Sequence, residues 1–399
     1  MIDPQEVIQR YTPEEICQGA EDYFASIPDT TYLERKPFFD GAMAGETLYR
    51  FGLALKHLKL SPGMTLLDFG SGTCWTSKYL IQLGCQVTAC DPSPTALEIG
   101  RNVVEKSTLA DTERFTTLPF RGRSIDAPDN SFDRVLCFDS FHHIPNWQEV
   151  LGEMYRVLKP GGLITFAEPG YGHSKAATSQ FEMKRSVVLE NDIHIPEIEK
   201  VALKLGFKNL RWQAVISRDY ESRKFKDLVT GKWWSSSYRR MARSCISALK
   251  DALSHTSIFS LSKGNLKIDS RQMRFLAAQI SSAPTSQPFA ENREISISVK
   301  VKNIAASTWL SENEDECGVV YLGCHRLNEH GSIAQEDVAR AKIDRDMEKG
   351  HEAVITLVFP PHPKGKHDYI LDLVSERVSW FELANCKGHQ THTLSFTVQ

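Results

Sequence analysis

The spacing of apolar and polar positions changes twice along this chain of 399 residues. Residues 1–60 carry apolar side chains at helical spacing, and residues 64–216 alternate short apolar runs with helical segments. From about Arg274 onward, apolar and polar residues alternate one by one. Spacings of three and four residues are typical of helices that lie on a core, whereas strict alternation is typical of half-buried strands. The pattern therefore predicts an N-terminal helical segment, then an α/β region, then an all-β region.

The N-terminal segment contains a clear helix start. Thr12 is the expected N-cap, Pro13 occupies the first helical position, and Glu15 is the capping-box partner of Thr12. A second helix is predicted around Glu46–Leu60. The stretch Thr31–Asp40 between them is aromatic and basic without periodicity. It is expected to be a packed connector, with a flap over a ligand as the alternative.

Strands and helices are expected to alternate in the second region. The predicted strands are Thr65–Leu67, Gln86–Cys90, Arg134–Phe138, Leu163–Ala167 and one near Leu210–Ile216, and the predicted helices are Cys74–Leu83, Pro94–Glu105, Asn146–Leu158 and Pro196–Leu205. This alternation predicts a doubly wound, mostly parallel sheet with helices on both faces. Ligands of such folds bind at the carboxyl ends of the strands. The polar residues at those ends are Asp68, Asp91, Asp139 and Glu168.

A glycine turn directly follows the first of these strands. In LLDFGSG, Leu66–Gly72, Gly70 and Gly72 let the backbone approach a ligand, and the helix after them points unpaired N–H groups at it. Asp91 ends the next strand 19 residues later, the spacing at which a carboxylate accepts hydrogen bonds from a ribose. Its alternative role is to cap the following helix. A dinucleotide fold and an S-adenosylmethionine fold both remain open, although Trp75 stands where a dinucleotide site has its third glycine.

Later elements decide between these folds. Five elements occur in order over about 100 residues: LLDFGSG, Asp91 after a strand, a P-D-x-S-F-D run and F-H-H within Pro128–Asn146, and V-L-K-P-G-G within Leu151–Gly170. With them the chain closely resembles the class I S-adenosylmethionine-dependent methyltransferases of type 11. The resemblance implies a Rossmann-like domain with a seven-stranded sheet, S-adenosyl-L-methionine as cofactor, and S-adenosyl-L-homocysteine as product.

The resemblance also implies cofactor-binding roles at matching positions. These are Asp68, Gly70, Ser71 and Gly72 at the methionine end, Asp91 and Pro92 at the ribose, Gly122 and Arg123 at the adenine, and Asp139 and Phe141 at the methyl-transfer site. The chain departs from the family at Arg121, where an acidic residue usually reaches the adenine, and at Thr73–Trp75, where smaller residues are usual. No role is assigned to Trp75.

Methyl transfer to a hydroxyl also requires a base. His142 and His143 follow the fourth predicted strand, close to the expected position of the methyl group, and His173 lies in the long loop after the fifth. All three are candidate catalytic residues, although a histidine at such a position can equally be a packed turn residue. Asp192 and His194 do not have diagnostic metal-ligand spacing, so no metal site is predicted.

Composition narrows the class of protein. The formal net charge of -3 argues against nucleic acid as a partner, and no apolar run reaches the 18 residues of a membrane span. The N-terminus is polar and acidic, unlike a signal peptide. Nine scattered cysteines without a C-x-x-C pair suggest reduced thiols. A cytoplasmic protein is expected, either free or at the inner face of the membrane.

The last part of the chain shows two further features. Residues 218–250 are basic with interleaved aromatic side chains, which suggests either a helical arm packed between domains or a contact with a membrane surface or an assembly partner. Beyond them, alternation as in Ile295–Asn303 predicts an antiparallel sandwich of about seven strands. NIAASTW, Asn303–Trp309, and DLVSERVSWF, Asp372–Phe381, resemble an immunoglobulin-like domain that follows bacterial methyltransferases and glycosyltransferases of surface-polysaccharide synthesis.

Four segments are therefore expected: a helical cap (1–60), a methyltransferase domain (61–217), a basic helical linker (218–270) and an immunoglobulin-like sandwich (271–399). The expected activity is O-methylation of a sugar hydroxyl on a polysaccharide or glycolipid precursor. One alternative is a methyltransferase of small molecules or natural products. A different class is a non-catalytic binding or scaffold protein that keeps the cofactor fold.

Overall fold

The computed structural model describes residues 1–213, 239, 242–243, 245–246, 256–283, 288–313 and 315–399. The chain divides into two compact units. The first contains Met1–Leu60 and Met64–Leu266, and the second contains Ser61–Gly63 and Lys267–Gln399. The basic stretch 218–250 lies almost entirely outside the described residues. Within the described part of the chain, none of the helices has both the length and the apolar character needed to cross a membrane.

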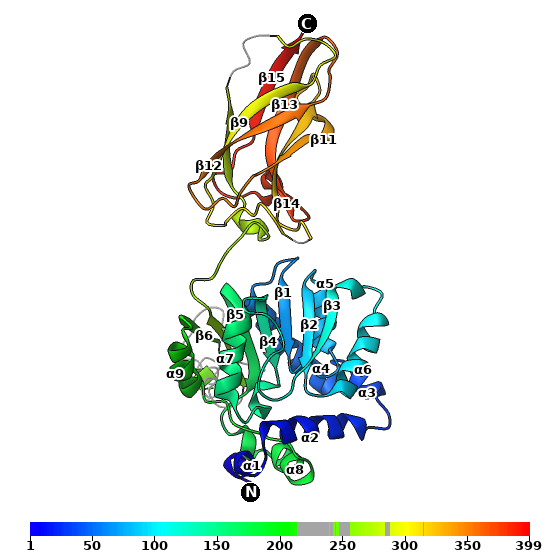
Figure 1. The fold of residues 1–399 in the computed structure, drawn as a ribbon, viewed down its shortest axis with the longest axis vertical. Coiled ribbons are helices and arrows are strands. Elements are labelled where there is room, and N and C mark those ends of the chain that lie inside the picture. The colour runs from blue at the N-terminus through cyan, green and yellow to red at the C-terminus, as the bar shows by residue number, and fades with distance from the viewer. Residues whose placement is uncertain (214–238, 240–241, 244, 247–255, 284–287, 314) are drawn as a thin grey trace. The chain divides into compact units, whose positions relative to one another are not determined.

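The first unit is built on a seven-stranded sheet with the strand order β3-β2-β1-β4-β5-β7-β6 (Figure 1). Its strands are β1 (Thr65–Phe69), β2 (Gln86–Asp91), β3 (Phe115–Pro119), β4 (Phe132–Phe138), β5 (Leu158–Pro169), β6 (Asn209–Gln213) and β7 (Thr256–Ser262). Strands β1 to β5 pair in parallel, and β7 pairs antiparallel with both β5 and β6. The predicted Rossmann-like, mostly parallel sheet is confirmed.

The α-helices described in this unit are α1 (Pro4–Arg10), α2 (Pro13–Ala25), α3 (Thr31–Glu34), α4 (Gly41–Leu58), α5 (Trp75–Gln82), α6 (Pro94–Glu105), α7 (Trp147–Val157), α8 (Ala177–Arg185) and α9 (Ile195–Leu205). Of these, α4, α5 and α6 pack on one face of the sheet, and α7 and α9 pack on the other. Successive residues of a strand point to opposite faces, so Leu66 packs with α4, α5 and α6 while Leu67 packs with α7 and α9. Helix α2 lies across one end of the sheet (Figure 1).

Local signals in the sequence have their expected structural counterparts. Thr12 is the N-cap of α2: its hydroxyl accepts the Glu15 N–H at 3.2 Å, and the Glu15 carboxylate accepts the Thr12 N–H at 2.8 Å.

Two strands of this sheet, β3 and β7, were not predicted. Strand β3 is short and half-exposed, so its apolar pattern is weak. Strand β7 falls inside the stretch expected to be a linker, and its partner β5 is distant in sequence.

The second unit consists of two antiparallel sheets. One has the order β11-β10-β13-β14 with β15 also paired to β13, and the other has the order β12-β9-β8. The strands are β8 (Ala278–Ser282), β9 (Ile295–Asn303), β10 (Val320–Leu327), β11 (Ile333–Lys342), β12 (Glu352–Phe359), β13 (Gly365–Ser375), β14 (Ser379–Trp380) and β15 (His392–Val398), with a short helix α12 (Phe381–Ala384). Side chains from both sheets form one buried cluster. The all-β architecture is confirmed, and β9 spans the predicted stretch Ile295–Asn303, whereas β8, β11 and β14 were not predicted.

Candidate active site

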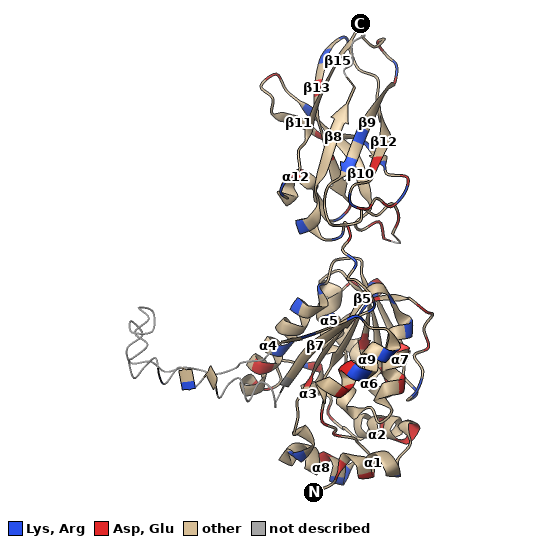
Figure 2. Cartoon of the chain, turned by 90° about the vertical axis from the view of Figure 1, so that its left-hand side faces the viewer, with Lys and Arg blue, Asp and Glu red and all other residues tan. Residues whose placement is uncertain are grey.

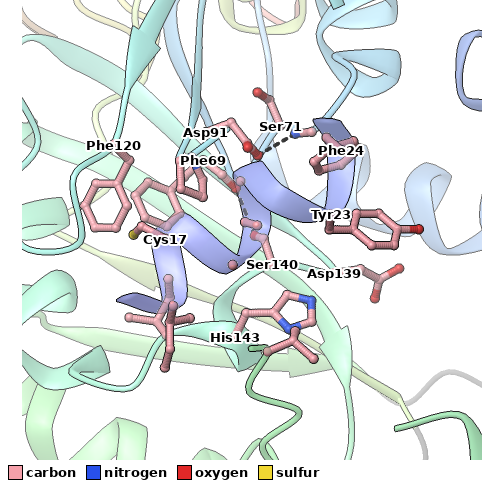
Figure 3. A pocket seen from close by; sticks show the side chains of 18 of the residues that line it. Cys17, Tyr23, Phe24, Phe69, Ser71, Asp91, Phe120, Asp139, Ser140 and His143 are labelled. Carbon is pink, nitrogen blue, oxygen red and sulfur yellow. Dashed lines mark hydrogen bonds between the residues drawn. The ribbon is translucent and has the colours of Figure 1, made fainter. Parts of the chain in front are cut away.

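A cavity of about 530 Å³ opens at the carboxyl ends of β1, β2 and β4. The strand ends contribute Gly70, Asp91 and Asp139 to its wall, and the N-terminal helices contribute side chains such as Tyr23 (Figure 3). The segment between α3 and α4 also reaches it, through Lys36, Pro37 and Phe39. The flap interpretation of this segment fits its position better than that of a mere connector.

The glycine turn after β1 has the expected shape. Gly70 and Gly72 have φ values of +69° and +50°, and a Cβ on Gly70 would lie 2.2 Å from the Cβ of Ser140. The N–H groups of this turn, however, are already used. Those of Gly70 and Ser71 donate to the Cys90 carbonyl at 2.7 and 3.1 Å, and that of Gly72 donates to a carboxylate oxygen of Asp91 at 2.7 Å. The turn thus brings backbone to the cavity without offering these three donors to a ligand.

Asp91 lines the cavity and also supports Ser93, the residue that caps α6. Its second oxygen accepts the N–H of Ser93 at 2.9 Å, which fixes the start of α6, while the side chain also lines the cavity. Burial raises the pKa of Asp91 to about 6, against the opposing effect of the bonds from Ser93 and Gly72. A carboxylate has about four acceptor positions. Two therefore remain for the hydroxyls of a ribose.

Asp68 lies behind the cavity wall. Its carboxylate accepts hydrogen bonds from the hydroxyls of Thr76 at 2.6 Å and Ser77 at 2.5 Å, at the N-terminal end of α5. Burial raises its pKa to about 6. Asp68 is not among the cavity-lining residues, so the structure gives it the role of fixing α5 against the glycine turn.

The end of β4 is organised by a buried carboxylate. Glu168 accepts the N–H groups of Ser140 and Phe141 at 3.1 and 3.0 Å, and it is hydrogen-bonded to the His142 ring at 2.7 Å. Phe141 packs in the core and does not line the cavity. Asp139 does line it and forms a bidentate pair with Arg50, with distances of 2.5 and 2.9 Å.

The three candidate histidines have different surroundings. His142 is buried, and burial lowers its pKa well below the usual range. His173 is 2.6 Å from a carboxylate oxygen of Glu190 and does not line the cavity. His143 does line the cavity (Figure 3), and its Nδ1 is 2.6 Å from the Leu189 carbonyl. A carbonyl only accepts, so in the neutral ring Nδ1 carries the proton and Nε2 keeps a lone pair.

Glu190, one of the polar residues in the loop after the fifth predicted strand that were expected to contact the acceptor, lines the cavity near His143. Burial raises its pKa, but the hydrogen bond with His173 and the charges of His143 and His142 outweigh that effect and lower it to about 2. Ligand atoms of His142, His143 and Glu190 lie within 4.8 Å of one another, a spacing that a metal ion accepts. Asp192, the earlier metal candidate, instead accepts the N–H of Ser174 at 2.7 Å.

The far end of the cavity is lined by Phe120, Gly122 and Asn146. The Asn146 amide nitrogen donates to the Gly122 carbonyl at 3.0 Å, while its Oδ1 is buried without a partner among the described residues. Such an acceptor suits the exocyclic amine of an adenine. Arg123 is not in the wall, because Glu14 and Glu149 hold its side chain at 2.6 and 3.3 Å. Pro92 lines the cavity beside Asp91.

Trp75, which the sequence left without a role, is the first residue of α5 and part of an aromatic cluster. Its ring lies 5.1 Å from Phe51, 6.4 Å from Tyr79 and 5.3 Å from Phe138. The cluster packs α4 against α5 and β4. Trp75 also lines the cavity, so its large side chain joins the aromatic cluster to the cavity wall.

Comparisons with known proteins agree with this geometry. Residues 67–166 match the type 11 methyltransferase domain. Demethylmenaquinone methyltransferase of Listeria monocytogenes is 36% identical over 113 residues, which are 28% of this chain and 46% of that protein. Phosphoethanolamine N-methyltransferase 2 of Caenorhabditis elegans is 31% identical over 162 residues, 39% of this chain and 35% of that protein. The chain thus spans less than half the length of these two relatives.

A solved structure of Haemonchus contortus phosphoethanolamine N-methyltransferase 2 with S-adenosyl-L-methionine is 20% identical, with a TM-score of 0.41; the match covers 66% of this chain and 61% of that one. The cofactor expected for a type 11 domain is S-adenosyl-L-methionine, and the residues present fit it: Asp91 has spare acceptors, Asn146 has an unused one, and Gly70 allows a close approach. Residues 67–166 of this chain match the type 11 methyltransferase domain, and they belong to a Rossmann-like fold whose cavity residues fit S-adenosyl-L-methionine.

Proposed function

We propose that this protein transfers a methyl group from S-adenosyl-L-methionine to a hydroxyl of its acceptor, and that the acceptor is a sugar on a polysaccharide or glycolipid precursor. The observation that carries the hydroxyl chemistry is His143, which lines the cavity with Nδ1 held by the Leu189 carbonyl. A neutral imidazole held in this way presents Nε2 as a base. The sugar acceptor is supported by the resemblance of Asn303–Trp309 and Asp372–Phe381 to a domain of surface-polysaccharide enzymes.

The cofactor supplies an electrophilic methyl group on a positively charged sulfur. The chain supplies alignment and a place for the proton. The bound cofactor would supply its methyl group to the acceptor oxygen, and Nε2 of His143 would take the hydroxyl proton. Leu189 keeps that nitrogen unprotonated before the reaction. Glu190, whose carboxylate lies 3.7 Å from His143 Nδ1, stabilises the imidazolium afterwards.

A second acceptor class is favoured by the side chains at the cavity. Tyr23, Phe39 and Met43 line it and remain 43%, 39% and 56% exposed. Exposed apolar side chains beside a pocket favour an apolar ligand. The relative named for demethylmenaquinone points the same way. A small apolar molecule is therefore the alternative acceptor, and a non-catalytic cofactor-binding protein is the alternative of another class.

Partners and compartment belong to the same proposal. We place the protein in the cytoplasm, with residues 218–250 or the β-sandwich as the contact to a membrane surface or an assembly partner. We propose no nucleic acid partner, which is supported by the formal net charge of -3 and by the interspersed acidic and basic residues on the helices of the first unit (Figure 2).

A transfer assay with methyl-labelled cofactor tests the proposal. Sugar nucleotides, lipid-linked sugars, polysaccharide fragments and an apolar quinol are offered in parallel. Label in a sugar fraction supports the glycan acceptor, and label only in the quinol supports the apolar alternative. If the cofactor binds but no acceptor of either class is labelled, the enzymatic proposal fails.

A further inference from the structure

Lys36 is a positive charge in the cavity wall that lacks a partner. It lies between α3 and α4 and is half-buried. Within the described parts of the chain, its ammonium group forms neither an ion pair nor a hydrogen bond. Arg50, a cation beside the end of β4, is by contrast paired with Asp139. A half-buried ammonium group without a counter-charge suits an anionic ligand, because pairing offsets the cost of its burial.

Two carboxylates of the cavity wall act on the charge of Lys36. Burial lowers its pKa, while Asp139 and Asp91 act in the opposite direction. These two carboxylates end β4 and β2, and β1 lies between those strands in the sheet. Lys36, Asp91 and Asp139 all line the same cavity.

Three of the backbone N–H groups at this place already have acceptors. The N–H groups of Gly70, Ser71 and Gly72 already donate to the Cys90 carbonyl and to Asp91. The positive end of α5, the common alternative, already faces the carboxylate of Asp68. The start of α5 thus faces a carboxylate of the protein itself, whereas Lys36 in the cavity wall can face a carboxylate of the ligand.

We propose that Lys36 binds the α-carboxylate of the cofactor's methionine portion. The proposal rests on the proposed function for the presence of that cofactor. With the ribose at Asp91 and the adenine beside Asn146, the amino-acid end of the cofactor would occupy the rest of the cavity, which Lys36 lines. It lies outside residues 67–166, so the N-terminal segment completes the cofactor site of the methyltransferase domain.

Calorimetric binding of two ligands isolates this contact. S-adenosyl-L-homocysteine has the α-carboxylate, whereas 5′-methylthioadenosine keeps the adenosine and the sulfur but has no amino-acid portion. We expect Lys36→Met to weaken S-adenosyl-L-homocysteine by roughly 10- to 100-fold, the range for a charge-assisted contact, and methylthioadenosine by less than about twofold. Lys36→Arg should recover most of the loss. Lys175→Met, at an exposed lysine outside the cavity wall, is the matched control and should change neither.

The outcomes distinguish a failure of the Lys36 assignment from a failure of the proposed function. Methylthioadenosine binding also reports whether Lys36→Met is folded. If the variant binds both ligands as tightly as the wild type, or loses affinity for both equally, the assignment of Lys36 is overturned while the cofactor site stands. If the wild-type chain binds neither ligand, the proposed function falls, and the Lys36 assignment falls with it.

Discussion

Cofactor affinity should depend on pH through one buried carboxylate, Asp91. Its pKa is raised to about 6 because it is buried. Ribose hydroxyls donate most strongly to the ionised form. At pH 5 only about a tenth of such a group is ionised, so we expect S-adenosyl-L-homocysteine to bind about tenfold more weakly at pH 5 than at pH 8. Asp91→Asn should weaken binding at pH 8 by roughly 10- to 100-fold and flatten the pH profile.

Calorimetry between pH 5 and pH 8 measures both effects. Glu21→Gln is the control, because Glu21 holds the same segment through the Ser93 and Thr95 hydroxyls, both at 2.6 Å, without lining the cavity. The contribution of Asp91 to folding stability should change with pH in the opposite direction to the affinity. The folded chain binds the Asp91 proton more tightly than the unfolded chain, so that contribution is complete below pH 3.8 and is lost as pH rises through about 6. A flat wild-type affinity profile, or an Asp91→Asn profile identical to that of the wild type, would refute the reasoning.

Three further predictions concern the walls of the site. Gly70→Ala should abolish cofactor binding because the new Cβ would lie 2.2 Å from the Cβ of Ser140. Gly72→Ala should cost only about 1–2 kcal/mol of backbone strain. Cofactor titrations of the two variants check this contrast. Trp75→Ala should lower the free energy of unfolding by about 3–5 kcal/mol in urea, and a loss below 1 kcal/mol would contradict its placement in the aromatic cluster. Removal of metals with EDTA should leave methyl transfer unchanged because His173 already satisfies Glu190; a rate restored by added divalent cation would show an ion there.

The sequence predicted those features that short segments determine. The capping box at Thr12 depends on residues three positions apart, and the structure contains it. The glycine turn and Asp91 follow from the ends of two neighbouring strands, and both lie at the cavity. The alternation of strands and helices fixed the parallel part of the sheet because each strand carries its own apolar run.

Features that depend on distant partners were beyond the sequence. The Leu189 carbonyl is 46 residues from His143, and that contact distinguishes it from His142 and His173. Asp68 occupies a strand end like Asp91, but the hydroxyls in the next helix turn it away from the cavity.

Lys36 and Asn146 belong to the site by position alone. No motif marks either residue, because one follows α3 and the other precedes α7. Lys36 is distinguished only by lacking a partner in the described structure, and Asn146 by one unused oxygen. Both signals exist only once the chain is folded.

The rate of methyl transfer in a single turnover, with His143→Ala compared with His173→Ala, tests the central claim most directly. Both variants remove an imidazole, but only His143 lines the cavity. A general base contributes roughly 10²- to 10⁴-fold, so His143→Ala should lose that much in rate while S-adenosyl-L-homocysteine binds as before. His173→Ala should retain most of the rate. Equal rates in His143→Ala and the wild type would contradict the account.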